Sequence, residues 1–352
     1  LITALGHEYD SGNFKKNLSD CLELSKYNSF QERKEISLKN GKYRGIGMST
    51  YIEACGGGGP EYASLALGGG GNIQVKIGTQ SNGQGHATSY AQIVSEVLEI
   101  DINQINVVQG NSIEIENGSG TGGSRSMPVG GNALYIATKK FLNNATIALA
   151  NHLETNSNKI SYKKGIFYVD NNEFSLAKIT QLFDINKVLD TNADWTPNVG
   201  TFTYPNGVHI CELEIDKYTG VVKILNYTVV DDFGKVINPL LLEGQVHGGV
   251  AQGIGQALLE DTIYDRETGQ LLSGSFMDYS IPRANDIPFI KFSYNEFLCT
   301  TNPLGIKGAG EAGAIGAPPA VINAVCNALN IKHINMPAKP EKVWDLISSN
   351  KY

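Results

Sequence analysis

The chain has 352 residues, of which 41% are apolar and 18% are charged. This length and composition allow a large packed core, in two domains or one large one. A formal net charge of −7 argues against an extended nucleic-acid-binding surface, which needs clustered Lys and Arg. No apolar run approaches the roughly 18 residues that cross a bilayer, and no signal-peptide pattern opens the chain. We therefore expect no nucleic-acid partner, no membrane span and a cytoplasmic location.

The cysteines are scattered and include no C-x-x-C pair; they are Cys21, Cys55, Cys211, Cys299 and Cys326. This spacing predicts neither a disulfide framework nor an iron–sulfur or zinc site, so we expect reduced thiols. The chain opens with LITALGHEYDSGNF, without Met, which is typical of a fragment or of one processed subunit.

The first half of the chain predicts a helical arm followed by strands and Gly-rich turns. Residues 8–39 are polar and helical in pattern, with Ser and Asn breaks. Strand patterns follow at 43–54, 60–67 and 72–79, a helix at 81–100 and a short strand at 102–110. A Gly-rich loop at 118–131 leads into a long amphipathic helix at 132–153.

The second half begins after an irregular region, 158–200, which is the best candidate for a subdomain boundary. It contains short strands ISYK and IFYV, a helix near 175–183 and the predicted loop TNADWTPNVG. A hairpin around KYTG (208–234), a Gly-studded helix (238–260), a strand (290–297) and a helix from 318 to 330 follow. Antiparallel hairpins mixed with helices predict an α+β fold. We expect an arm at 1–42 and subdomains at 43–200 and 201–352.

Four Gly-rich loops each lead into a helix: NGQGHAT (82–88), GTGGSRS (120–126), GQVHGGVAQGIG (244–255) and GAGEAGAIGAPP (308–319). Glycine allows close approach of a ligand, and a helix start offers unpaired N–H groups. No G-x-x-x-x-G-K-[ST] P-loop occurs, and no G-x-G-x-x-G follows a strand in the dinucleotide-binding context. The amides of Gln84, Gln245 and Gln252 can both donate and accept hydrogen bonds to a heterocycle edge. The loops together favour one long anionic ligand.

Several of these segments resemble the molybdopterin-binding large subunit of the xanthine dehydrogenase family, in its carbon monoxide dehydrogenase-like and aldehyde or nicotinate dehydrogenase-like forms. The resemblance extends over nearly the whole chain, through YDSGNF (9–14), GIGMSTYIEACGGGGPEYASL (45–65), GTQSNGQGHATSYAQIVSEVL (78–98), GSGTGGSRSMPVGGNA (118–133), INPLLLEGQVHGGVAQGIGQAL (237–258), NPLGIKGAGEAGAIGAPPAVINAVCNAL (302–329) and MPAKPEKVWDLI (336–347). It implies the second, C-terminal molybdopterin-binding domain of such a subunit.

The resemblance implies a molybdenum–molybdopterin cytosine dinucleotide cofactor, whose metal is held by the pterin dithiolene rather than by protein side chains. It implies the following cofactor-binding residues: Gln84, Gly85, His86, Thr88, Gly122, Gly123, Ser124, Arg125, Ser126, Gln245 and Gly310. It also implies [2Fe–2S] and FAD groups on partner subunits, an iron–sulfur small subunit and an FAD medium subunit. The N-terminal cofactor-binding half would be a separate subunit or missing sequence, so the chain would be incomplete alone.

Glu311 is the one carboxylate in the loop KGAGEAGAIGAPP and matches the family's active-site glutamate. The implied reaction is hydroxylation of an aldehyde, an N-heterocycle or carbon monoxide with water as oxygen source, with Glu311 as the general base. Apolar surroundings raise the pKa of a carboxyl and suit it to this role, whereas a helix N-terminus lowers it. Both effects could hold in different catalytic states.

Other readings stay open. A non-catalytic pterin- or nucleotide-binding module for cofactor assembly or delivery would keep the loops but would not need Glu311. His247 fits a packed histidine as well as a cofactor contact, and Arg125 fits a loop staple as well as a phosphate ligand. For Lys307 the sequence favours neither of two roles, pairing with a carboxylate or positioning its loop. Asp231 and Asp232 are expected to end a strand.

Overall fold

The computed structural model describes residues 1–57, 59–182, 193–195 and 202–349. Within these ranges the helices are α1 Phe14–Leu24, α2 Phe30–Lys39, α3 His86–Leu98, α4 Asn132–His152, α5 Leu176–Leu182, α7 Pro239–Leu258, α8 Ala312–Leu329 and α9 Pro340–Ser349. The strands are β1 Lys42–Ile52, β2 Glu61–Leu67, β3 Ile73–Ile77, β4 Ile105–Val108, β5 Ile160–Lys163, β6 Ile166–Val169, β7 Asn172–Ser175, β8 Ala193–Trp195, β9 Asn206–Asp216, β10 Val222–Asp232 and β11 Ile290–Asn295.

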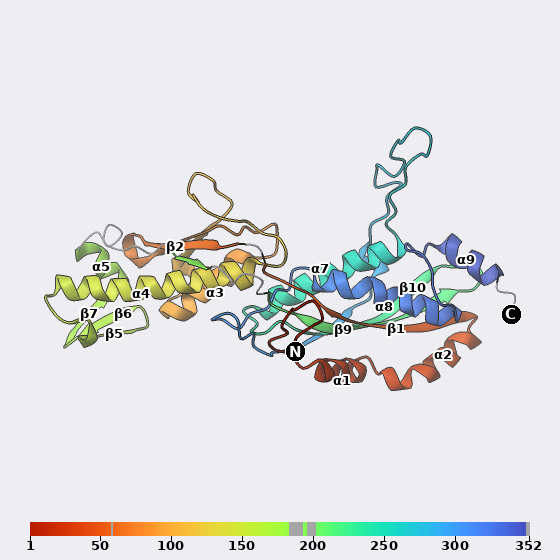
Figure 1. The fold of residues 1–352 in the computed structure, drawn as a ribbon, viewed down its shortest axis with the longest axis horizontal. Coiled ribbons are helices and arrows are strands. Elements are labelled where there is room, and N and C mark those ends of the chain that lie inside the picture. Colours follow the sequence, from red (N-terminus) through yellow and green to blue (C-terminus); the bar gives the residue numbers. More distant parts are fainter. Residues whose placement is uncertain (58, 183–192, 196–201, 350–352) are drawn as a thin grey trace.

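These elements form an elongated molecule with two lobes (Figure 1). The long-strand lobe contains the sheet β1-β9-β10-β11 with α1, α2, α7, α8 and α9. The short-strand lobe contains the sheets β4-β3-β2-β8 and β5-β6-β7 with α3, α4 and α5. Both larger sheets combine antiparallel pairs with one parallel pair, β10 with β11 and β3 with β4. The predicted α+β class is confirmed.

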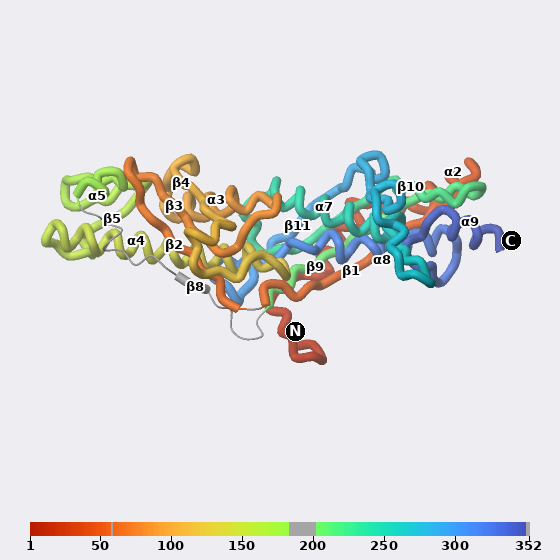
Figure 2. Tube along the Cα trace, turned by 90° about the horizontal axis from the view of Figure 1, so that it is seen from above, coloured from red at the N-terminus to blue at the C-terminus, as the bar shows by residue number. Residues whose placement is uncertain are grey.

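The long-strand lobe buries both faces of its sheet because β9 alternates two sets of apolar side chains. Cys211, Leu213 and Ile215 join the core beneath α7 and α8. Val208 and Ile210 instead pack with Cys21 of α1. The segment predicted as a peripheral arm is therefore two helices that cover one face of this sheet. Figure 2 shows β1 and β9 running alongside α8 in the same lobe.

Close contact between α8 and β1 depends on glycine. A Cβ atom at Gly47 would lie 2.2 Å from the carbonyl oxygen of Ala320, which no real side chain tolerates. The helix can therefore lie almost on the backbone of β1. Because β1 pairs with β9 along its whole length, residues 42–52 belong to the sheet of the long-strand lobe. The sheet therefore joins a strand from the predicted subdomain 43–200 to strands from the predicted subdomain 201–352. The limits of the two subdomains stay a prediction.

Two local predictions are wrong. The last core helix starts at Ala312 rather than at Pro318, and it contains Pro318 and Pro319 in its interior. The two prolines are the seventh and eighth residues of the helix, beyond the first four N–H groups that have no intrahelical acceptor, so the helix lacks the hydrogen bonds that they would otherwise donate to Ala314 and Ile315. The predicted loop at 191–200 contains β8, which pairs with β2; the rest of that segment lies outside the described residues.

α8 is also the one described helix that is long and apolar enough to cross a membrane, although the sequence reading expected no such run. Its packing argues for a core helix, because 61% of it is buried inside the protein. Val321, Ala324 and Val325 are fully buried in the core of the long-strand lobe.

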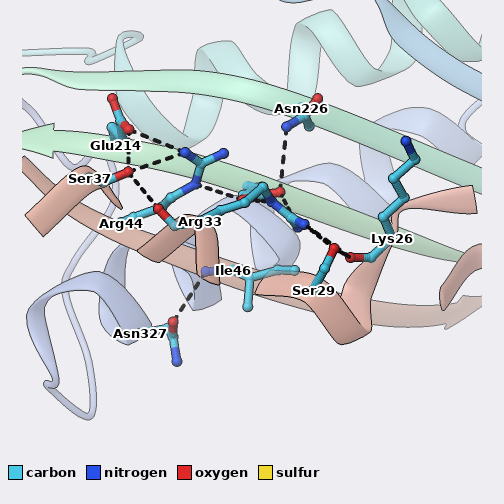
Figure 3. A network of polar contacts seen from close by, with 10 residues as sticks. Lys26, Ser29, Arg33, Ser37, Arg44, Ile46, Glu214, Asn226 and Asn327 are labelled. Atoms are coloured by element: carbon cyan, nitrogen blue, oxygen red, sulfur yellow. Dashed lines mark hydrogen bonds and ion pairs between the residues drawn. The ribbon is translucent and has the colours of Figure 1, made fainter. Parts of the chain in front are cut away.

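A polar network fastens α2 to this sheet (Figure 3). Arg33 and Arg44 donate from their Nε atoms to Oε1 of Glu212 at 2.8 and 2.7 Å. Ser37 donates to Glu214 at 2.5 Å, and Arg44 reaches the same carboxylate at 3.3 Å. Burial raises the pKa of Glu212, but the two guanidinium groups outweigh it and hold that pKa below the ordinary value. The ionised carboxylate therefore stabilises the docked helix.

This network predicts a pH-dependent difference between the wild type and Glu212→Gln. A carboxyl whose pKa is lowered by folding stabilises the protein above its unfolded pKa, about 4.3, and loses that contribution as the pH falls through the folded value. We expect Glu212→Gln to lower the free energy of unfolding at pH 7 and to approach the wild type at acid pH. Urea unfolding of the wild type and of Glu212→Gln, from pH 7 to acid pH, measures this difference in the free energy of unfolding. A difference that does not shrink at acid pH would contradict the assignment.

Candidate active site

A cavity of about 310 Å³ opens where the two lobes meet. The short-strand lobe supplies the start of α3 and the loop before α4, and the long-strand lobe supplies the start of α7 and the segment before α8. Nine predicted site residues line it: Gln84, His86, Gly122, Gly123, Ser124, Ser126, Gln245, Gly310 and Glu311. Segments far apart in the sequence thus meet at one site. Of the three glutamines considered together, Gln252 does not line the cavity.

The start of α3 presents polar groups to the cavity. Gly85, its N-cap residue, has φ of 76°, a left-handed conformation that favours glycine. The turn places Gln84 and His86 on the cavity wall, whereas Thr88 and Gly85 do not line it. His86 Nδ1 lies 3.2 Å from the carbonyl oxygen of Gln80. Burial lowers the pKa of His86, so its imidazole is neutral at pH 7.

The loop before α4 is held to α3 by hydroxyl groups. Tyr90 donates to the carbonyl oxygen of Ser126 at 3.1 Å, and its hydroxyl lies 2.6 Å from that of Thr79. Thr121 donates to the carbonyl oxygen of Gln80 at 2.6 Å. These contacts fix the two Gly-rich loops relative to each other, and both loops keep side-chain oxygens at the cavity.

Arg125 does not line the cavity. Its side chain is buried and forms an ion pair with Glu61 at 2.7 Å. It also donates to the carbonyl oxygens of Gly59, Pro60 and Gly120. The Arg125 side chain therefore links its loop to β2. This geometry gives no support to the predicted contact of Arg125 with the cofactor.

Gly122 is not required by the protein's own packing. A Cβ atom there would meet nothing within 4 Å, and its backbone lies outside the left-handed region. By contrast, a Cβ atom at Gly118 in the same loop would lie 2.6 Å from Cα of Gly78. Gly118 is needed for the fold, whereas Gly122 leaves open space at the wall of the cavity. Because Gly122 has no side chain and faces open space, a bulky ligand in the cavity can come into van der Waals contact with its backbone.

These two glycines predict opposite effects. We expect Gly122→Ala to leave the free energy of unfolding within about 1 kcal/mol of the wild type, because alanine fits the backbone and the space. We expect Gly118→Ala to lower it by about 1–3 kcal/mol through the clash with Gly78. Urea unfolding measures both changes. An equal loss in the two variants would show that Gly122 is needed for packing.

The long-strand lobe closes the cavity with Gln245 and the segment before α8. Gln245 Nε2 donates to the carbonyl oxygen of Gly310 at 2.6 Å, which fixes the loop to α7. Lys307 lines the cavity but is buried and paired with Asp232 at 2.6 Å. Of the two functions considered for Lys307, the structure shows that it holds a carboxylate. Asp231 and Asp232 end β10, as predicted.

Glu311 is the last residue of this segment, immediately before α8. It occupies the N-cap position, but its side chain makes no capping hydrogen bond. The carboxylate is exposed at the cavity, and the hydroxyl of Ser124 lies 3.3 Å from its Oε2. The expectation of apolar surroundings for Glu311 therefore needs correction, because Glu311 faces an open space and a hydroxyl from the opposite lobe.

Sequence reasoning missed several groups at the site. Thr121 and Lys235 line the cavity, and Lys235 Nζ has Glu96 at 3.5 Å. Glu53 lies behind Ser124, whose hydroxyl is 3.0 Å from its Oε1. A lone acid in YIEACGGGG, directly after a strand and before glycines, is the signal that could have indicated Glu53.

His247 does not line the cavity. It lies 3.7 Å from Glu243 and packs edge-on against Phe289, which agrees with a packed histidine.

All five cysteines are free, as predicted. Among the described residues no group of His, Cys, Asp and Glu has a metal-ligating arrangement.

Comparisons with known proteins show the family of the chain. The model of the molybdopterin cofactor-binding domain matches residues 20–288. The chain is 32% identical to the carbon monoxide dehydrogenase large chain of Afipia carboxidovorans, over 97% of this chain and 46% of that protein. It is also 32% identical to the nicotine 6-hydroxylase large subunit of Paenarthrobacter nicotinovorans, over 96% of this chain and 44% of that protein.

Solved structures give the same result. The chain superimposes on a Cu,Mo-containing carbon monoxide dehydrogenase with a TM-score of 0.86 and 30% identity, covering 99% of this chain and 47% of that one. For quinoline 2-oxidoreductase from Pseudomonas putida 86 the TM-score is 0.88 at 29% identity. The chain spans about half the length of the curated relatives it matches. The chain therefore belongs to the molybdopterin-binding xanthine dehydrogenase family.

Proposed function

We propose that this chain is the molybdopterin-binding catalytic part of a molybdenum hydroxylase, with Glu311 as its general base. The observation that carries the proposal is the convergence of Gly-rich loops from both lobes on one cavity with Glu311 at its edge. The oxidised substrate would be an aldehyde, an N-heterocycle or carbon monoxide, in line with the relatives' names. The chain contributes the cofactor cradle and the proton acceptor.

The residues at the cavity fit a molybdopterin. Open space at Gly122 leaves room for a bulky ring system against the loop. Gln84 and Gln245 lie at the cavity with amide groups that can pair with the donors and acceptors of a pterin edge. Ser126 adds a hydroxyl group, Thr121 adds a hydroxyl oxygen that can accept, and Lys235 adds a positive charge suited to phosphate. We include Gly85, His86, Thr88, Gly123, Ser124 and Gly310 in the proposed cradle, and assign Arg125 to loop support.

When bound, the molybdenum–pterin group, proposed in its cytosine dinucleotide form, supplies the redox chemistry of the oxidation. Protein side chains would not ligate the metal. Two observations support Glu311 as the group that takes a proton in the cavity: its carboxylate is exposed there, and no Lys or Arg of the described residues pairs with it. A positioned base of this kind contributes roughly 10²–10⁴ to a rate.

The proposal includes partners. An iron–sulfur subunit with [2Fe–2S] clusters and an FAD subunit would take the electrons away. Another polypeptide, or further sequence, would supply the N-terminal cofactor-binding half that the longer relatives contain. A cytoplasmic location, in which the free thiols stay reduced, completes the proposal.

A second reading is a non-catalytic module that binds the pterin for cofactor assembly or delivery. It shares the cradle but has no use for a proton acceptor that faces the ligand. Metal and pterin analysis of the assembled complex, together with assays on carbon monoxide, nicotine and an aldehyde, separates the two. We expect molybdenum, a pterin and turnover of one substrate class. Bound pterin without turnover of any of them would favour the delivery module, absence of molybdenum would refute the hydroxylase, and absence of both molybdenum and pterin would refute both.

A further inference from the structure

Glu53 and Glu311 face the same hydroxyl group from opposite sides. Glu53 follows β1, and Glu311 precedes α8. The Ser124 hydroxyl lies 3.0 Å from Glu53 Oε1 and 3.3 Å from Glu311 Oε2. A hydroxyl has one proton to donate and two lone pairs that accept. Ser124 can therefore donate to one of the carboxyl groups and accept from the other when that group is protonated.

The three side chains are held in this arrangement by the backbone. Ser124 has φ of 54°, an uncommon conformation for a residue with a side chain. Gly56 donates to the carbonyl oxygen of Gly123 at 3.0 Å, which ties the serine loop to the segment after Glu53. A Cβ atom at Gly310 would lie 2.9 Å from the Ser124 hydroxyl oxygen, so a side chain there would displace this hydroxyl. Close approach of the three segments is therefore built into the fold.

The surroundings of Glu53 make its carboxylate a stronger proton acceptor. Its Oε2 atom is buried and has no hydrogen-bond partner, and no Lys or Arg in the described part of the chain forms an ion pair with it. The titratable groups that face it are Glu311, the Cys55 thiol and the Tyr51 hydroxyl. Burial raises the pKa of Glu53, and the nearby charge of Glu311 adds to this, although hydrogen bonds from Cys55 and Ser124 oppose it.

We propose that Glu53 and Ser124 form a proton relay behind Glu311, in which Glu53 is a positioning residue that takes the proton Glu311 has accepted. The Glu311 carboxylic acid donates its proton to the Ser124 oxygen, and the Ser124 hydroxyl gives its own proton to the Glu53 carboxylate. The products are a Glu311 carboxylate, an unchanged serine and a Glu53 carboxylic acid. Glu311 is thereby ready to act again, an inference that rests on its proposed function as the base.

The coupling is tested on the 352-residue chain without cofactor, by following the carboxyl carbon of Glu53 with ¹³C NMR during a pH titration. The assignment comes from the signal lost in Glu53→Gln. We expect Glu311→Gln to move the Glu53 midpoint to lower pH, because a like charge is removed. Ser124→Ala should move it to higher pH, because a donor to the carboxylate is removed. Glu173→Gln, the same change at an exposed site on β7, should leave it unchanged. An unaltered midpoint in Glu311→Gln would overturn the relay.

The relay itself is tested in the assembled enzyme. We expect Glu53→Gln to keep its molybdenum content but to lower kcat at least about tenfold in dilute buffer. Concentrated acetate or imidazole should restore it, because a small base replaces the proton acceptor. A merely structural defect would not respond to buffer. Wild-type kcat in Glu53→Gln at every buffer concentration, with loss in Glu311→Gln, would overturn the relay and leave the proposed function intact. Full activity of Glu311→Gln would refute the proposed function instead.

Discussion

Glu311→Gln is expected to lower turnover of the assembled enzyme by at least about 100-fold while its molybdenum and pterin content stays at the wild-type level. Glutamine has nearly the same shape as glutamate, so the N-cap position of α8 and the contact with Ser124 can be kept. What disappears is the ability to accept a proton. Steady-state rates measured beside metal analysis of the same sample test this.

Glu243→Gln is the matched control for this prediction. Glu243 is a glutamate on α7, two residues from Gln245, but it does not line the cavity. We expect this variant to keep its activity within about twofold, since surface substitutions away from buried contacts change little. Retained activity in Glu311→Gln would remove Glu311 as the base. An equal loss in both variants would point to a general effect of charge.

Lys307→Met is expected to lower the free energy of unfolding by about 3–5 kcal/mol, the usual cost of leaving a buried partner charge unpaired. Both side chains of the Lys307–Asp232 pair are fully buried. Asp232 Oδ1 accepts from the backbone N–H groups of Gly234 and Phe297 and so fixes the end of β10. Loss of the lysine leaves this carboxylate without its cation. Urea unfolding gives the free energy.

The double variant Lys307→Met with Asp232→Asn provides the internal check. Removing both charges should recover part of the lost stability, because residues in direct contact are not additive. Lys15→Met, a change at an exposed lysine of α1, should lie within about 0.5 kcal/mol of the wild type. A Lys307→Met variant as stable as Lys15→Met would contradict the importance of this pair.

The sequence allowed much of the fold to be predicted because its patterns are local. The β9–β10 hairpin, α3, α4 and α7 follow from residue periodicity and from turn or cap residues at their ends. The start of α8 could not be placed, because Pro318 and Pro319 resemble a helix start and the glycines before them resemble a loop. Helical packing against β1 and α7 overrides those preferences, as Gly47 and Gly313 make room for it.

The site was predictable where glycines and polar groups lie together in one loop. Gln84, Gln245 and Glu311 meet at the cavity, but the position of each side chain depends on contacts across the chain. Arg125 pairs with Glu61, which is 64 positions away. The approach of Glu53 to Ser124 likewise depends on tertiary packing, 71 positions apart. No short spacing in the sequence encodes such pairs.

The most direct test of the central claim is to locate the molybdenum in crystals of the assembled enzyme by its anomalous scattering. We predict a single molybdenum peak at the cavity between the lobes, on the side that the Glu311 carboxylate faces, with the pterin against the open wall at Gly122. Molybdenum bound elsewhere, with this cavity filled only by solvent, would contradict the proposed site and the role of Glu311 together.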